Sequence, residues 1–350
     1  MSDVGDRARG CLLGLAAGDA LGRPAENLEP AEIERRWGRL TEIEPGGGGT
    51  DDTEYSIFAA MLLCRHGSAL TRHDVARAYR EEVIPAITGP MRGAGFSELG
   101  TVLALRRGLQ PPLTGRWHHH GWSDGLAMRA APYGVFAAGD PAEAARLAAE
   151  DGVVSHSGEG VHGGRAVAAA VAAAMAGAEP GEVVEAGLGA IPEDSWTHRS
   201  VRAAVAVVRD GGAARELHDA VVVRHYPWTD LAPEAVALAF AAYLIGEGDV
   251  EESVVAAANL GRDADTNAAI AGALAGAGRG EGGVPARWAA RIAPVRGACL
   301  PVVAGRHVLE VADELVAARA GGLPGAGGVG EGPGGGAHAR RPADDFGEGG

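Results

Sequence analysis

Alanine-rich runs constrain the fold of this 350-residue chain more than any other feature. Alanine has the highest helix propensity of all residues, so runs such as 160–177, 234–245 and 266–277 favour helices that pack closely. No series of alternating apolar and polar residues marks out a sheet, and no motif repeats at a fixed period. The best strand candidate, 221–223, follows a segment with a helical pattern. The sequence therefore predicts an all-α protein.

Apolar periodicity and capping residues indicate where the expected helices lie. Asp140 is followed by a proline at the first helical position and a glutamate at the third, which is a typical helix start. The first helix carries Gly10, Gly14 and Gly18 on one smooth face, which allows another helix to approach closely. Helices are expected at about 5–21, 54–65, 72–84, 98–108, from 141 onward, 160–177, 196–209, 213–224, 234–245, 250–258, 266–277 and 307–319.

Charge and cysteine content exclude several classes of protein. A formal charge of −15 and a pI near 5.2 argue against general affinity for nucleic acid or for an anionic membrane. Cys11, Cys64 and Cys299 lie far apart, which is typical of reduced thiols in a cytoplasm. The first residues lack the pattern of a signal peptide, and no apolar stretch is long enough to span a bilayer. We therefore expect a soluble cytoplasmic protein with no nucleic-acid or membrane partner.

The last thirty residues differ from the rest of the chain. Residues 321–350 are rich in glycine, proline and charge and contain almost no large apolar side chain. Such a segment cannot bury enough surface to offset the entropy lost on ordering. We expect a single helical domain over 1–320, followed by a disordered tail.

Two short acidic clusters, more than 200 residues apart, each open one of the alanine-rich runs. Carboxylate and hydroxyl oxygens are the ligands that Mg²⁺ and Mn²⁺ prefer. If the two helix starts face each other, four carboxylates and two hydroxyls can hold a pair of ions. The alternative is a pair of ordinary N-caps, because Asp and Thr are common at that position. The candidate metal ligands are Thr50, Asp51, Asp52, Asp263, Asp265 and Thr266.

A further carboxylate, Glu26, lies in a loop just after the first helix. Loop carboxylates beside metal sites often serve as acid, base or gate, although a solvated glutamate is the simpler interpretation.

Four motifs resemble those of the ADP-ribosylglycohydrolases. Residues 10–22 with Glu26 are similar to the N-terminal motif of that family, and 50–53 and 259–273 are similar to its two metal motifs. The segment 123–132 is similar to its central substrate loop, and His156 occupies the place of a family histidine. The motifs occur in the family's order over residues 5–280.

This resemblance implies an orthogonal helical bundle with a central cleft that holds two Mg²⁺ or Mn²⁺ ions. It implies that the six candidate ligands bind the ions, and that the ions engage the ribose diol and a water molecule. The implied catalytic residues are Glu26 and Asp52. For the segment 123–132, the alternative is a tight turn before a helix. For His156, the alternative is a purely structural role. The implied substrate-binding residues are Asp19, Ser123, Asp124, Gly125, Met128 and His156.

Two segments depart from the family's pattern and leave the identity of the leaving group open, and a third suggests no functional role. Residues 158–164 lack the Asn and Pro of the family's protein-directed members, and Glu98 is a loose substitute for an aspartate that some members carry. His118, His119 and His120 are consecutive, so their side chains point in different directions and favour an exposed loop over a metal site.

The leading hypothesis is a metal-dependent hydrolase that cleaves ADP-ribose from an arginine or serine of a modified protein. The second keeps this chemistry but acts on a ribosylated small molecule, such as an N-riboside or a metabolite of NAD. The third is a non-catalytic binding or structural protein. The adjacent carboxylates argue against it, because a purely structural protein has no reason to retain so many of them. The sequence leaves open the acceptor, the choice of metal, the stereochemical course and the oligomeric state.

Overall fold

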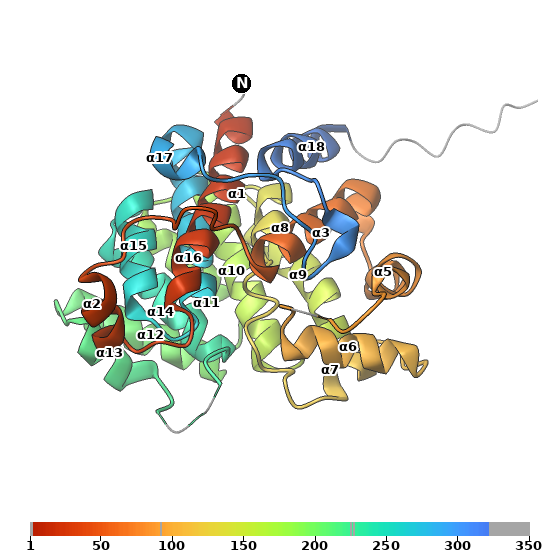
Figure 1. Cartoon of the computed structure of the whole chain (residues 1–350), viewed down its shortest axis with the longest axis horizontal. Coiled ribbons are helices and arrows are strands. Elements are labelled where there is room, and N and C mark those ends of the chain that lie inside the picture. The colour runs from red at the N-terminus through yellow and green to blue at the C-terminus, as the bar shows by residue number, and fades with distance from the viewer. Residues whose placement is uncertain (1–2, 92, 225, 227, 322–350) are drawn as a thin grey trace, which may run out of the picture.

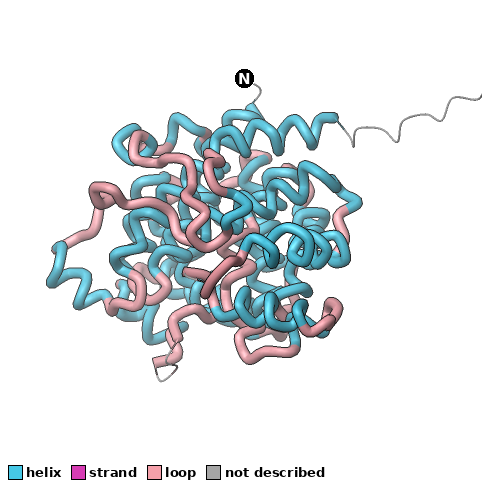
Figure 2. The backbone as a smooth tube through the Cα atoms, turned by 45° about the vertical axis from the view of Figure 1, so that its right-hand side comes forward, coloured by secondary structure: helices cyan, strands magenta, loops and turns pink. Residues whose placement is uncertain are grey.

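The computed structural model describes residues 3–91, 93–224, 226 and 228–321, and the elements in these ranges are helical (Figure 1). They contain no β-strand, only two isolated bridges, between Leu28 and Arg262 and between Ser123 and Leu231. Figure 2 shows the same chain as helices joined by loops. The all-α prediction is confirmed. Most of the expected tail, 322–350, lies outside the described residues.

The α-helices, in chain order, are α1 (Asp3–Gly22), α2 (Pro30–Trp37), α3 (Asp51–His66), α4 (Arg72–Ala78), α5 (Ile84–Ala86), α6 (Phe96–Arg106), α7 (Leu113–Arg116), α8 (Ala131–Phe136), α9 (Pro141–Ser155), α10 (Glu159–Met175), α11 (Pro180–Gly189), α12 (Trp196–Arg209), α13 (Ala214–Val221), α14 (Ala232–Ile245), α15 (Val250–Leu260), α16 (Ala264–Arg279), α17 (Ala286–Ala289) and α18 (Val308–Gly321). A π-helical segment, Tyr79–Val83, joins α4 to α5. No helix within the described ranges is both long and apolar enough to cross a bilayer.

The predicted helices are present, with the one expected over 72–84 divided into α4, the π-helical segment and the start of α5, and five further helices were not predicted. Residues 221–223 form no strand: α13 ends at Val221, three residues before the expected end at 224, and an extended link follows. The unpredicted helices are ten residues long or shorter, too short to display a clear apolar period. They are α2, α7, α8, α11 and α17.

The pair α1 and α16 determines where the two acidic clusters meet. Their glycine-rich faces pack against each other in antiparallel register, and we call Gly10, Gly14, Gly18 and Gly22 the glycine seam. An ideal Cβ at each seam position would lie 2.1–2.5 Å from a carbonyl oxygen of α16, so the two backbones touch. The facing oxygens belong to Gly276, Gly272, Ala268 and Ala264. The end of α1 therefore lies beside the start of α16.

Candidate active site

A cavity of about 640 Å³ opens where α3 and α16 begin. Its walls come from segments that are distant in the sequence, including the loop before α3 and the loop before α16. Nine acidic residues line it against three arginines, so its field strongly favours cations. The lining acids are Glu26, Asp51, Asp52, Glu54, Glu98, Asp124, Asp230, Asp263 and Asp265, and the arginines are Arg23, Arg291 and Arg296.

Asp19 holds the first turn of α3 against the end of α1. Its fully buried carboxylate accepts hydrogen bonds from the backbone N–H of Thr50 at 2.8 Å and of Thr53 at 3.1 Å, and from the Thr53 hydroxyl. Burial raises the pKa of Asp19 to about 6, against the opposing effect of these hydrogen bonds. Asp19 is not among the residues that line the cavity. Its predicted contact with substrate thus finds no support in its position, and its observed role is to place α3.

The first acidic cluster meets the second across the cavity. The Thr266 hydroxyl donates to Asp52 Oδ1 at 3.3 Å, joining residues 214 positions apart. Burial, followed by the charges of Asp19 and Asp265, raises the pKa of Asp52 well above its usual value. Burial and Asp263 act in the same way on the pKa of Asp265. Acidic groups are thus gathered at buried positions, which destabilises their anionic forms unless a cation is present.

Unpartnered oxygens distinguish these aspartates from ordinary helix caps. Thr50 caps α3 by accepting from the Asp52 N–H at 3.4 Å, whereas Asp263 makes no side-chain cap bond to α16. One buried carboxylate oxygen each of Asp52, Asp124 and Asp265 has no hydrogen-bond partner. Buried carboxylate oxygens are seldom left without a partner, so these three atoms point to a missing ligand.

The donor set fits a hard divalent cation in its chemistry, since it consists of carboxylate and hydroxyl oxygens. In the described ranges, no three His, Cys, Asp or Glu side chains are already gathered closely enough to hold a metal ion. Thr50 and Asp51 lie half-buried on the α3 side, and Asp263 lies half-buried on the α16 side.

Glu26 is placed at the rim of the cavity by a short antiparallel bridge. Asn27 N–H donates to the Arg262 carbonyl at 2.7 Å, and Arg262 N–H donates to the Leu28 carbonyl at 2.9 Å. The loop after α1 is thereby tied to the loop that precedes Asp263. Partial desolvation is the main reason why the pKa of Glu26 is raised. Burial is the main reason why the pKa values of Asp263 and Asp265 are raised, and the Glu26 carboxylate adds to the increase in both.

The predicted substrate loop forms one wall of the cavity. Ser123, Asp124, Gly125 and Met128 are buried residues whose surfaces line it. The loop is held from outside by a second bridge, in which the Asp124 N–H donates to the Asp230 carbonyl at 2.9 Å. Asp230 itself lines the cavity and had no predicted role.

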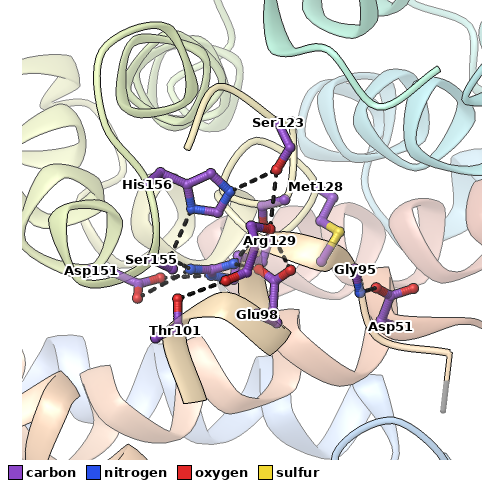
Figure 3. A network of polar contacts seen from close by, with 12 residues as sticks. Asp51, Gly95, Glu98, Thr101, Ser123, Met128, Arg129, Asp151, Ser155 and His156 are labelled. Carbon is purple, nitrogen blue, oxygen red and sulfur yellow. Dashed lines mark hydrogen bonds and ion pairs between the residues drawn. The ribbon is translucent and has the colours of Figure 1, made fainter. Parts of the chain in front are cut away.

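His156 lies behind this loop, almost fully buried and outside the cavity lining. Its Nε2 is 3.1 Å from Ser123 Oγ and its Nδ1 is 2.8 Å from Ser155 Oγ (Figure 3). Burial lowers its pKa well below the usual value, and the nearby charge of Arg129 acts in the same direction. The structure thus brings His156 to the substrate loop but not to the cavity surface.

A buried arginine behind the substrate loop had no role predicted from the sequence. Arg129, 1% exposed, donates to Glu98 Oε1, to Asp151 Oδ2 and to the Gly125 carbonyl at 2.8, 2.8 and 2.6 Å (Figure 3). Arg129 lies in the segment 123–132, interpreted as a substrate loop, and its sequence context gives no sign of three partners from separate segments. Glu98, which the sequence suggests only as a loose substitute for a family aspartate, is fully buried and links this network to the cavity wall.

Two other features complete the rim. The Glu54 carboxylate accepts from the backbone N–H groups of Ala298, Cys299 and Leu300 at 2.7–2.8 Å, which fixes the segment 291–299 over α3. His120 stacks on Phe96 with ring centroids 4.8 Å apart. His119 is exposed, while His118 and His120 are half-buried, so the expected exposed loop is only partly exposed.

Comparison with known proteins places these features in a family. The family model for ADP-ribosylglycohydrolase matches residues 1–323. An uncharacterized protein of Archaeoglobus fulgidus is 31% identical over 295 residues, covering 81% of this chain and 90% of that protein. The ADP-ribosylarginine hydrolase Tri1 of Pseudomonas putida is 26% identical, covering 89% and 78% respectively.

A solved structure supports the same assignment. An ADP-ribosylglycohydrolase-related protein complex superposes with a TM-score of 0.62 and 27% sequence identity, covering 91% of this chain and 98% of that one. With the family model spanning the described residues from α1 to α18, the chain belongs to the ADP-ribosylglycohydrolase family.

Proposed function

We propose that this protein is a metal-dependent hydrolase that cleaves the glycosidic bond between ADP-ribose and an arginine or serine side chain of a modified protein. The observation that carries the proposal is the set of unpartnered, buried oxygens of Asp52, Asp124 and Asp265 around one acidic cavity. Family membership supplies the reaction class. The similarity to a protein named ADP-ribosylarginine hydrolase supports arginine as an acceptor.

Two Mg²⁺ or Mn²⁺ ions would be held by Thr50, Asp51, Asp52 and, across the cavity, Asp263, Asp265 and Thr266. When bound, such ions orient a sugar diol and lower the pKa of coordinated water. Without a cation, the opposed carboxylates of α3 and α16 repel one another: after burial and the charge of Asp19, the charge of Asp265 adds to the raised pKa of Asp52.

The chain's own residues supply binding, charge and proton transfer. Cleavage of a glycosidic bond develops positive charge at the anomeric carbon, and a cavity lined by nine acids stabilises that charge. Glu26 lies at the rim, beside Asp263 and Asp265, where its carboxyl group can give a proton to the leaving nitrogen or oxygen or take one from water. Asp52 has one carboxylate oxygen free to orient the attacking water.

The proposal is tested with ADP-ribosyl-arginine and ADP-ribosyl-serine peptides, and with free nucleotides and N-ribosides, on metal-depleted and metal-restored protein. We expect release of ADP-ribose from a peptide only after metal is restored. Activity confined to small ribosides would place the substrate among metabolites instead. Inactivity on every ribosyl compound, with metal bound, would contradict the proposal.

Glu26→Gln separates proton transfer from metal binding. This replacement keeps the size of the side chain but removes its ability to exchange a proton, so turnover should fall by about 10²–10⁴-fold. Mn²⁺ affinity, measured by calorimetry, should stay close to that of the wild type. Asn27→Ala serves as a matched control, because it removes the 3.0 Å hydrogen bond to Glu26 and leaves the carboxylate in place. Unchanged turnover in Glu26→Gln would remove this residue from the mechanism.

A further inference from the structure

Six side chains, two from the substrate loop and four packed against it, form a closed circuit of hydrogen bonds (Figure 3). We call this circuit the polar ring. Its contacts measure 2.5–3.1 Å, and all six residues are at least nine-tenths buried. Its members, in order around the circuit, are Arg129, Ser155, His156, Ser123, Ser97 and Glu98.

The hydrogens of the ring can be assigned one after another. Glu98 is ion-paired with Arg129, and its carboxylate carries no hydrogen to donate, so the Ser97 hydroxyl donates to Glu98 Oε2 at 2.5 Å. Ser97 has then used its one hydrogen, so Ser123 donates to Ser97 Oγ at 3.1 Å. The hydroxyl of Ser123 is used in its turn.

The remaining contacts fix the tautomer of His156. Because Ser123 has no further hydrogen, the contact at 3.1 Å requires His156 Nε2–H to donate to Ser123 Oγ. In the neutral imidazole Nδ1 is then an acceptor, and it accepts from Ser155, which accepts from Arg129 Nη2 at 2.7 Å. The hydrogen bonds thus run in one direction, from Arg129, which only donates, through Ser155, His156, Ser123 and Ser97 to Glu98, which only accepts. A protonated His156 would break this order and would face the charge of Arg129.

One edge of the ring faces the cavity and the other is hidden. Ser97, Ser123 and Glu98 line the cavity, whereas Arg129, Ser155 and His156 do not. Gly125 lies over the ring, because an ideal Cβ there would be 2.9 Å from Glu98 Oε1, 3.0 Å from Ser97 Oγ and 3.1 Å from His156 Nε2. Only a glycine leaves the ring accessible from the cavity at this point.

We propose that the polar ring turns this wall of the cavity into a surface of hydrogen-bond acceptors, which selects the hydrogen-bond donors of the substrate. All hydroxyl hydrogens are committed inside the ring, so Ser97, Ser123 and Glu98 present lone pairs to the cavity. His156 is a positioning residue: it does not line the cavity, but its Nε2–H donates to Ser123 and so fixes the direction of the hydrogen bonds in the ring. The inference rests on the proposed function for the identity of the substrate, whose donors are ribose hydroxyls or the N–H groups of a guanidinium acceptor.

The tautomer is tested without any substrate. In ¹⁵N NMR spectra of histidine-labelled full-length protein at neutral pH, the ring of His156 should show a protonated Nε2 and an unprotonated Nδ1. Ser155→Ala, which removes the donor to Nδ1, should perturb this signal, whereas the matched control Thr101→Val should leave it unchanged. Thr101 is equally buried and donates to the Ser97 carbonyl at 2.8 Å, outside the ring. A protonated Nδ1 in the wild type would overturn the assignment, whatever the enzyme's activity.

The acceptor wall is tested by ligand binding in the presence of Mg²⁺. Ser123→Ala should weaken binding of ADP-ribose or of free arginine about tenfold, which corresponds to 1.4 kcal/mol, and Thr101→Val should change neither. Loss for ADP-ribose identifies the ribose hydroxyls as the recognised donors, and loss for arginine identifies the guanidinium. Unchanged binding of both ligands by Ser123→Ala would overturn the proposal. Failure of the wild type to bind either ligand, with the expected tautomer present, would instead count against the proposed function.

Discussion

Replacing Gly18 by alanine tests whether the glycine seam sets the geometry of the active site. An ideal Cβ at this position would lie 2.1 Å from the Ala268 carbonyl oxygen, whereas real Cβ atoms stay at least 3.0 Å from such atoms. The backbones of α1 and α16 must therefore separate locally by about 0.9 Å, since a backbone carbonyl cannot rotate away. Overpacking of this kind costs about 1–3 kcal/mol, partly offset by a gain of about 1 kcal/mol in helix propensity.

We expect a net loss of up to about 2 kcal/mol in the free energy of unfolding of Gly18→Ala, measured by urea denaturation. Gly18 is adjacent to Asp19, so the same displacement shifts the start of α3 relative to α16. A misplacement of about 1 Å can cost about 10²-fold in rate, and we expect a fall of that order in kcat/KM.

Gly278→Ala is the matched control in the same helix pair. Gly278 lies in α16, and an added Cβ there meets nothing within 4 Å, so alanine should stabilise the protein by up to about 1 kcal/mol. Activity should stay unchanged. If Gly18→Ala were as stable and as active as Gly278→Ala, the idea that close backbone contact positions the acidic clusters would be wrong.

Three further predictions concern stability and metal binding. Glu54→Gln should lower the free energy of unfolding by about 2–3 kcal/mol in urea denaturation, because a charged acceptor of three backbone N–H groups is lost; an unchanged midpoint would contradict this. Mg²⁺ or Mn²⁺ at a hundredfold excess over Kd should stabilise the wild type by about 2.7 kcal/mol in thermal unfolding, and Asp265→Asn should abolish that gain. Burial raises the pKa of Cys64 from 9.0 to about 11, so its contribution to stability is fully present below pH 9 and is lost as pH rises toward 11. Cys64→Ala should lose less stability over that interval, and an equal loss would count against the shift.

The sequence predicted the parts of the site that depend on local patterns. Asp52 and Asp265 each lie in the first turn of a helix, and the Asp and Thr residues around them left a shared site and two ordinary N-caps as alternatives until the family resemblance favoured the shared site. The glycine face of α1 was also predictable, because four-residue spacing places Gly10, Gly14 and Gly18 on one side. The partner of that face, α16, was not, since many helices in this chain are rich in alanine.

Other parts of the site depend on contacts between distant segments. Asp19 was expected to bind substrate, yet its carboxylate is directed at the first turn of α3, a placement set by how two helices cross. Arg129 forms hydrogen bonds with residues of α6, α9 and the substrate loop. The spacing of these residues along the chain does not predict such a network. The short helix α8, which begins two residues later, is stabilised by its buried packing rather than by its own six residues.

Crystals grown with saturating Mn²⁺ and measured at the manganese absorption edge would test the pairing of the two acidic clusters most directly. If α3 and α16 converge on a cation, anomalous peaks should appear between Asp52 and Asp265, within coordination distance of their carboxylate oxygens. A map with no ion between these two carboxylates, together with full activity in a chelator, would contradict it.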